Sequence, residues 1–304
     1  MLVSEFSFFF IHVLVRSGVV PGRPFVVEGK SRTATSQNFS LGEENYASSW
    51  SNIQKPTILA KTALSGEIGS RWLTLGEAEH ASVASFAKHT LQLMSIGAPS
   101  ELLAASQEAS LDEIRHAKIC YGFASTFLGS EFGPGPLDVE GSLGKMELKK
   151  IAQSIIQEGC IEETISAVEA HLGAYTAQEP SIKEALGQIA TDETRHAQFA
   201  WDTIQWMVKR FPEVQDYVTE TFKTEVEDRL LALEKSVLLK EASNCDALDV
   251  NDIFRSYGLV VMCDKNKVRE AAIQDIIMPV YLKGLNDVKM VSKLVTKFKF
   301  GFLQ

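Results

Sequence analysis

The stretch LDEIRHAKIC, residues 111–120, decides the fold, because the chain writes it again as TDETRHAQFA, residues 191–200. Both copies contain Asp-Glu-x-Arg-His-Ala, and the second copy follows the first by 80 residues. A glutamate and a histidine three positions apart lie on one face of a helix. The repeat therefore predicts two equivalent helices with a carboxylate–imidazole pair each, Glu113 with His116 and Glu193 with His196.

Apolar residues at steps of three and four predict four long helices around these motifs. Pro99 and Pro180 stand where a helix would begin, and Gly97 stands where one would end. The helices form two hairpins, which indicates an internal duplication of a helix pair. The predicted helices cover residues 71–97, 99–128, 145–177 and 180–210.

The segment between the two hairpins, GSEFGPGPLDVEGSL at residues 129–143, is rich in Gly and Pro. A helix of about 28 residues is roughly 42 Å long, and about fifteen extended residues reach roughly 50 Å. The segment can therefore return along the whole length of a helix. We predict an all-α fold: a four-helix bundle with a long crossover, an N-terminal arm and additional C-terminal helices.

The length of 304 residues suits one large domain or two. We predict an N-terminal extension that is partly irregular (residues 1–68), the four-helix bundle (69–212) and a helical C-terminal region (213–304). Within the extension, RPFVVEGKSRTA at residues 23–34 predicts a short strand or hairpin.

Composition limits partners and location. The net charge of −9 argues against nucleic acid as the main ligand. The apolar segment LVSEFSFFFIHVLV at residues 2–15 is too short to span a bilayer, which leaves a signal segment or a packed strand or arm. The four cysteines are scattered without a CxxC motif, so a zinc or rubredoxin-like site is not expected. This fits a reducing compartment, and a cytoplasmic location is favoured.

Two Glu-x-x-His helices with a glutamate from each of two further helices make a dinuclear metal site. The first helix supplies Glu79 on its apolar stripe. In the third helix the repeat offset maps Glu79 onto Gly159, so another residue must serve. Glu163 shares a stripe of small apolar residues, whereas Glu158 shares with Glu162 and Glu169 a face that is typical of solvent exposure. We prefer Glu163 as the ligand and keep Glu158 as the alternative.

The aspartates of the repeated motif, Asp112 and Asp192, are candidates for orienting the histidines, because a ligating histidine usually donates its other ring N–H to a carboxylate. We expect Asp192 to orient His116 and Asp112 to orient His196; the alternative is that both are ordinary surface aspartates. Arg115 and Arg195 are expected to be surface ion-pair partners. The histidines without a partner at ligand spacing are expected to be surface or packing residues: His12, His80, His89 and His171.

With EAEHAS, DEIRHA, EGCIEET and DETRHA, the chain resembles the ferritin-like di-iron carboxylate superfamily over about residues 70–210. Rubrerythrins and di-iron hydroxylases belong to that superfamily. The resemblance implies two iron ions, with manganese as the other possible metal, and makes Glu113 and Glu193 the bridging ligands. The ligands it implies are Glu79, Glu113, His116, Glu163, Glu193 and His196.

The leading functional hypothesis is an oxygen-activating di-iron oxidoreductase of hydroxylase type that acts on an unknown substrate. Its electrons would come from a separate reductase, because no flavin, NAD or iron–sulfur motif is present in the sequence. The alternative is a metal-handling or antioxidant protein, either a ferroxidase or a di-manganese protein that dismutates peroxide. A third reading is a helical interaction protein with a vestigial site.

Overall fold

The computed structural model describes residues 22–39, 49–51, 63–240 and 248–300. Its long elements are all helices, and its strands have two or three residues each, which confirms the all-α prediction. The apolar segment at residues 2–15 and His12 lie outside the described residues. The α-helices are α3 Ser65–Ser95, α4 Ser100–Leu128, α5 Leu148–Ser154, α6 Thr164–Thr176, α7 Pro180–Arg210, α8 Gln215–Lys240, α9 Leu248–Ser256, α10 Met262–Ala272, α11 Met278–Leu282 and α12 Val291–Thr296.

The other elements are short. Two segments are π-helical, η1 Ile155–Glu163 and η3 Ile273–Ile277, and two are 3-10 turns, η2 Pro212–Val214 and η4 Val288–Met290. The strands form two antiparallel pairs, β1 Val26–Val27 with β2 Lys30–Ser31 and β3 Ser36–Asn38 with β4 Phe132–Pro134. The first pair is the hairpin that the sequence predicted at residues 23–34.

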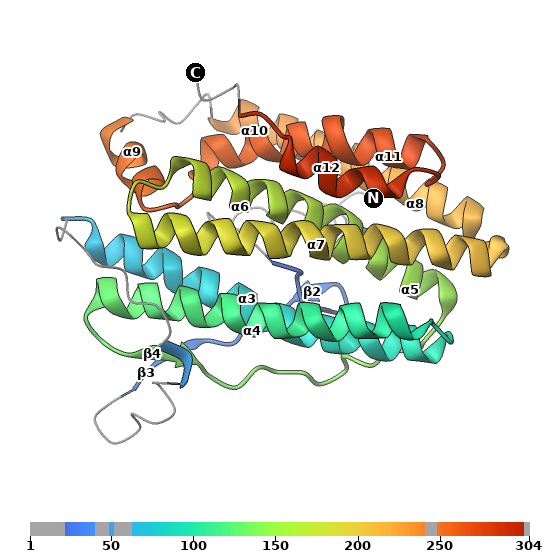
Figure 1. Ribbon diagram of the computed structural model, residues 1–304, viewed down its shortest axis with the longest axis horizontal. Helices are drawn as coiled ribbons and strands as arrows, with labels where there is room; N and C mark the ends of the chain where they lie inside the picture. The colour runs from blue at the N-terminus through green and yellow to red at the C-terminus, as the bar shows by residue number, and fades with distance from the viewer. Residues whose placement is uncertain (1–21, 40–48, 52–62, 241–247, 301–304) are drawn as a thin grey trace, which may run out of the picture.

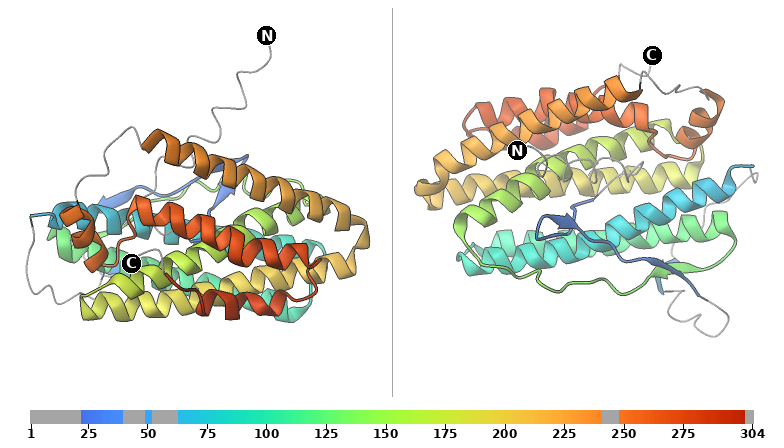
Figure 2. Two further views of the ribbon diagram at one scale, coloured as in Figure 1. Left: turned by 90° about the horizontal axis from the view of Figure 1, so that it is seen from above. Right: turned by 180° about the vertical axis from the view of Figure 1, so that it is seen from behind.

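The helices are stacked in layers of antiparallel neighbours (Figure 1). The α3–α4 hairpin forms one layer, α6 and α7 form the next, and α8 with α10, α11 and α12 covers the far side of α6 and α7. After α4 the chain returns along the bundle to begin α5 beside the start of α4, so the long crossover is present (Figure 1). Seen from behind, the β1–β2 hairpin crosses the face of the bundle (Figure 2).

One apolar core joins the bundle to the C-terminal helices. Its aromatic link runs from Trp201 of α7 to Phe222 of α8, whose ring centroids are 5.1 Å apart, and on to Tyr281 of α11 at 5.5 Å. Aromatic side chains bury large areas and favour such offset contacts. The C-terminal helices are therefore packed onto the bundle as part of the same core.

Ion pairs reinforce that junction on a face that the sequence analysis placed in solvent. Glu169 of α6 is fully buried and pairs with Arg269 at 2.8 Å and with Lys265 at 3.4 Å, both from α10. Glu162 of η1 pairs with Arg229 of α8 at 3.0 Å. The expectation of a solvated face is wrong, because helices α8 and α10 cover it and supply the cations that burial of these carboxylates requires.

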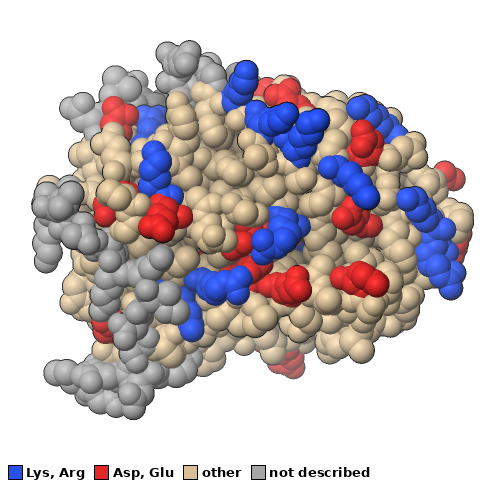
Figure 3. Space-filling model, viewed as in Figure 1, with Lys and Arg blue, Asp and Glu red and all other residues tan. Residues whose placement is uncertain are grey.

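Exposed charge, in contrast, is mixed in sign. On the face shown in Figure 3, acidic and basic side chains lie among one another over an otherwise uncharged surface. Among the described residues, no helix has both the length and the apolar character needed to cross a membrane.

The π-helical segment η1 interrupts the third helix of the bundle between α5 and α6. A π-helix has a wider turn than an α-helix and is frequent at functional sites. Gly159 allows this segment to approach α7: a Cβ at Gly159 would lie 2.8 Å from the Cβ of Ala200. The contact brings η1 against the second copy of the repeated motif.

We predict opposite effects for alanine at two helical glycines. Gly159→Ala should lower the free energy of unfolding by about 1–3 kcal/mol, because the Ala200 Cβ is fixed to its helix and cannot yield. Gly187→Ala, where a Cβ meets no atom within 4 Å, should raise it by up to about 1 kcal/mol. Chemical denaturation of both variants measures the difference. Equal effects of the two substitutions would contradict the close η1–α7 contact.

The buried Lys265 makes stability depend on pH. Burial lowers the pKa of Lys265 from 10.5 to about 8, although Glu169 acts in the opposite direction. Between pH 8 and pH 10.5 the unfolded chain therefore binds more protons than the folded chain, and the free energy of unfolding rises with pH. The destabilisation caused by burying the charged Lys265 is greatest below pH 8 and disappears as the pH rises through 10.5. Lys265→Met removes that cost.

The change in free energy of unfolding that Lys265→Met causes relative to wild type should therefore be more positive at pH 7 than at pH 10, by about 1–3 kcal/mol. Urea denaturation of both proteins at the two pH values gives the comparison, with Lys267→Met, an exposed lysine of the same helix, as the control. A difference that does not change with pH would show that Lys265 is not buried as a cation.

Candidate metal centre

Six acidic and imidazole side chains from four segments meet at the centre of the bundle. The segments are α3, α4, η1 and α7, and each contributes at least one carboxylate. Their exposed fractions lie between 0% and 2%. In each of two groups of four, one ligand-type atom per residue lies within 4.8 Å of the others. The groups are Glu79, Glu113, His116 and Glu193, and Glu113, Glu163, Glu193 and His196.

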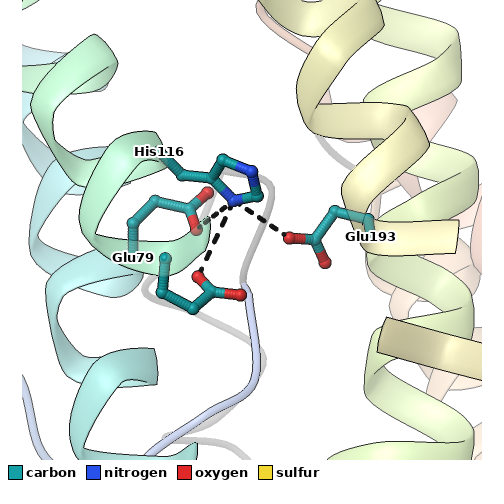
Figure 4. Close-up of side chains that lie close together, drawn as sticks. Glu79, His116 and Glu193 are labelled. Atoms are coloured by element: carbon teal, nitrogen blue, oxygen red, sulfur yellow. Dashed lines mark ion pairs between the residues drawn. The ribbon is translucent and has the colours of Figure 1, made fainter. Parts of the chain in front are cut away.

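The first group surrounds the ring of His116. Its Nδ1 lies 3.3 Å from Glu193 Oε1 and 3.7 Å from Glu79 Oε2. These carboxylates reach the ring from different helices, α7 on one side and α3 on the other (Figure 4). The Glu113 carboxylate, one turn before His116 on α4, is 3.9 Å from the same nitrogen. One nitrogen thus faces three carboxylates.

The second group repeats this arrangement around His196. Its Nδ1 lies 3.1 Å from Glu113 Oε1, 3.6 Å from Glu193 Oε1 and 3.8 Å from Glu163 Oε2. Glu113 and Glu193 therefore belong to both groups, whereas Glu79 and Glu163 belong to one each. The arrangement follows the sequence repeat, because each copy of the motif supplies one shared glutamate and one histidine.

The aspartates of the motif hold the opposite ring nitrogens, and they do so across the repeat. Nε2 of His116 donates to Asp192 at 3.3 Å, and Nε2 of His196 donates to Asp112 at 3.0 Å. These are the pairs that we expected to meet. Arg195 approaches Asp112 at 2.5 Å, and Arg115 also pairs with Asp112. With Nε2 occupied, Nδ1 of each ring is directed to the carboxylate cluster.

Electrostatics show how the cluster tolerates its own charge. Burial, together with the neighbouring Glu193, raises the pKa of Glu113 and of Glu163 well above the ordinary value. Burial alone would lower the pKa of His196, but the Glu113 and Glu193 carboxylates raise it to about 10. The imidazoles of His116 and His196 in turn lower the pKa of Glu193, although its burial alone would raise that pKa. Protons thus balance the negative charge when no metal cation does.

The hydrogen bond between His116 and Asp192, which joins the two copies of the motif, lowers the pKa of Asp192. Burial would raise this pKa, yet hydrogen bonds from His116 and Gln188 lower it to about 2. His116 responds in the complementary way: burial would lower its pKa, but Asp192 and the glutamates raise it well above the ordinary value. The aspartate therefore stays ionised and keeps a fixed acceptor for the ring N–H.

The atoms that face inward lack hydrogen bonds. Within the described part of the chain, none of the following forms one: both carboxylate oxygens of Glu113, Glu163 and Glu193, Oε2 of Glu79, and Nδ1 of His116 and His196. Buried polar atoms normally have a partner, so a converging set without one requires explanation. Oxygen and imidazole donors directed at common points fit divalent transition-metal ions. The cluster could therefore hold metal.

Glu158 and the other histidines lie outside this cluster. Glu158 is buried, but its carboxylate pairs with Lys88 at 3.0 Å and accepts a hydrogen bond from Ser85 at 3.2 Å. Its expected solvated position is wrong. His80 stacks edge-on against Trp50, His89 packs against Phe199, and His171 contacts Thr194, so none of these three is in either group.

Two arm residues at the site were missed by sequence reasoning. A Cβ at Gly22 would lie 3.0 Å from Glu79 Oε2 and 3.2 Å from Glu113 Oε2. Arg23, the next residue, is fully buried. Neither belongs to a periodic helix, so their place could not be read from a pattern. The sequence shows at this place only a glycine followed by an arginine at the start of a predicted hairpin. That combination is too common to indicate a metal site.

Comparison of the chain with protein-family models, with curated proteins and with solved structures finds no match in any of the three. The assignment therefore depends on the fold and the site. They define an all-α helical bundle with a buried carboxylate–histidine cluster that could bind metal.

The two third-helix carboxylates should respond oppositely to neutralisation in the metal-free protein. Glu158 pairs with the buried Lys88 at 3.0 Å and lies 3.9 Å from Nε of the buried Arg23. Glu158→Gln leaves both cations without this carboxylate and should lower the free energy of unfolding by about 3–5 kcal/mol. The pKa of Glu163 is raised in the folded protein, so folding at neutral pH must protonate this carboxyl group. Glu163→Gln removes that cost and should raise the free energy of unfolding by about 1 kcal/mol or more. Thermal unfolding in chelator measures both. Destabilisation by Glu163→Gln would refute the charge crowding described above.

Proposed function

We propose that the chain is a ferritin-like oxidoreductase with a dinuclear metal centre, most simply of iron, that reacts with dioxygen or peroxide. The observation that carries the proposal is the pair of overlapping ligand groups that share Glu113 and Glu193. In this assignment Glu79, Glu113 and His116 would hold one metal ion, and Glu163, Glu193 and His196 would hold the other. Glu113 and Glu193, which belong to both ligand groups, would be shared between the two ions. Manganese suits the same donor set.

When bound, such a metal pair would supply two redox-active ions that react with an oxidant. The protein's contribution is to place and tune the donors. Asp192 and Asp112 fix the tautomers of His116 and His196 so that Nδ1 faces the metals. The pKa values of Glu113 and Glu163 are raised. These two carboxyl groups would therefore release their protons when a metal cation binds. Burial of the cluster excludes bulk water from the chemistry.

Two activities suit this centre. The leading candidate is oxidation of an organic substrate with dioxygen, with electrons from a separate reductase. The second is metal oxidation or peroxide dismutation, which the complete burial of the cluster favours because these reactants are small. Oxygen uptake that depends on an organic substrate and a reductant supports the first; peroxide turnover without a reductant supports the second. A purified protein without iron or manganese, and with unchanged stability in chelator, contradicts both.

Metal titration of variants tests the ligand assignment. Wild-type protein should bind two Fe(II) or Mn(II) ions per chain under anaerobic conditions, one for each ligand group. Glu79→Gln and Glu163→Gln should each lose one ion, whereas Glu113→Gln and Glu193→Gln should lose both because these residues belong to both groups. Calorimetry and metal analysis give the stoichiometry.

Two matched controls accompany this titration. Glu158→Gln removes a buried carboxylate of the same segment, and Glu184→Gln removes an exposed one on α7. Both should keep two ions per chain. Loss of metal from Glu158→Gln, with retention in Glu163→Gln, would move the third-helix ligand to Glu158. Two full equivalents in Glu113→Gln or Glu193→Gln would overturn the shared site.

A further inference from the structure

The N-terminal arm, here residues 22–27, lies directly on the carboxylate cluster. Gly22 touches the half that contains His116: a Cβ there would be 2.6 Å from Ser82 Oγ and 3.0 Å from Glu79 Oε2. A separation below 3.0 Å is essentially never seen for a real Cβ atom, so a larger residue could not occupy this position without a shift. The backbone at Gly22 is therefore part of the wall of the centre.

Arg23 occupies the neighbouring half. Its Nη1 would lie 3.0 Å from a Cβ at Gly159, and its Cζ is 5.2 Å from the centroid of the Phe86 ring. The Phe86 ring is in turn 5.2 Å from the ring of His196. The guanidinium is thus inserted between α3 and η1 and separated from His196 by one aromatic ring. Two consecutive arm residues cover both halves of the cluster.

Hydrogen bonds fasten the arm to α3. Ser82 Oγ donates to the Arg23 carbonyl at 2.8 Å, and Arg23 Nε donates to Ser85 Oγ at 3.2 Å. Lys88 Nζ donates to the Val26 carbonyl at 3.1 Å and also pairs with Glu158. Phe25 and Val27 complete the contact by packing with Ala81 of α3. Each fastening element comes from the stretch of α3 that follows Glu79.

Not all buried hydrogen-bond donors of the arm have an acceptor. Within the residues that the structure describes, Nη1 and Nη2 of Arg23 form no hydrogen bond, although the side chain is fully buried. Unpaired buried donors are costly, and the arm contributes only a two-residue hairpin strand. Because a few side-chain hydrogen bonds carry much of its attachment to α3, we expect the arm to open locally without global unfolding.

We propose that the arm is the cover of the metal centre, fastened by Arg23 and Ser82, and that it restricts the centre to small reactants: dioxygen, peroxide and anions of about their size. This inference rests on the proposed function for its chemistry. An organic substrate reaches the centre only after the arm is released. The closed form therefore favours metal oxidation or peroxide chemistry over direct oxidation of a bulky substrate.

The first test needs no metal. In the metal-free protein, diethyl pyrocarbonate should modify His116 and His196 much more slowly than the half-buried His171 of α6, whose ring contacts Thr194 of α7. Ser82→Ala removes one buried hydrogen bond to the arm and should accelerate modification of both histidines by about ten-fold. Arg23→Ala should accelerate it at least as much. Peptide mass spectrometry measures all three sites in one sample.

Ser70→Ala is the matched control, because Ser70 is an exposed serine of the same helix whose hydroxyl donates to the Gly66 carbonyl, one turn before it. It should leave all three rates unchanged. Ser82→Ala keeps the test decisive if Arg23→Ala fails to fold. Modification of His116 and His196 in wild type as rapid as that of His171, or rates unaffected by Ser82→Ala, would show that the arm is not a cover.

The second test uses the metal-loaded protein. Azide should perturb the optical spectrum of the wild-type centre, whereas a bulky sulfonated aromatic chelator should extract its metal slowly. Extraction should become about ten-fold faster in Ser82→Ala, and azide binding should change little. Equal extraction rates in the two proteins would overturn the cover. A protein that takes up no metal would instead refute the proposed function, while histidine modification still decides the role of the arm.

Discussion

The structure depends on one electrostatic constraint: four glutamates and two histidines are buried together between four helical segments. Carboxylates so close to one another cannot all remain charged without a compensating cation or proton. The raised pKa values of Glu113, Glu163 and His196 express this requirement in the metal-free chain. A pair of divalent cations would satisfy it, and the surrounding hydrogen bonds already direct the donor atoms toward such a pair.

The third helix separates its carboxylates into three environments. Glu163 joins the cluster, Glu158 neutralises Lys88 beside the arm, and Glu162 and Glu169 pair with Arg229 and Arg269 of the C-terminal helices. Each buried carboxylate outside the cluster thus has a dedicated cation. This gives the C-terminal helices a physical role: they cover the acidic outer face of the helix that contributes Glu163, and they bring the charges that this face requires.

The sequence was most informative where spacing alone decides the geometry. Glu113 and His116 must share a helix face, the repeat makes a second such pair, and Pro180 begins α7 where expected. It was least informative at the third helix. There Glu169 is covered by α10 and Glu158 pairs with Lys88 of α3. Periodicity within one helix does not show which other elements cover its faces, so both residues were wrongly placed in solvent. An N-terminal arm was expected, but its position at the site was missed, because Gly22 and Arg23 act through close approach and burial, which leave no periodic signal.

The central claim is that the repeated motif builds the two halves of one dinuclear centre. Anomalous diffraction from crystals of the metal-loaded protein, collected on both sides of the iron and manganese absorption edges, tests it most directly. The account predicts two anomalous peaks, one beside His116 and one beside His196, with Glu113 and Glu193 in contact with both. A single peak, or peaks bound elsewhere than at these residues, would contradict it.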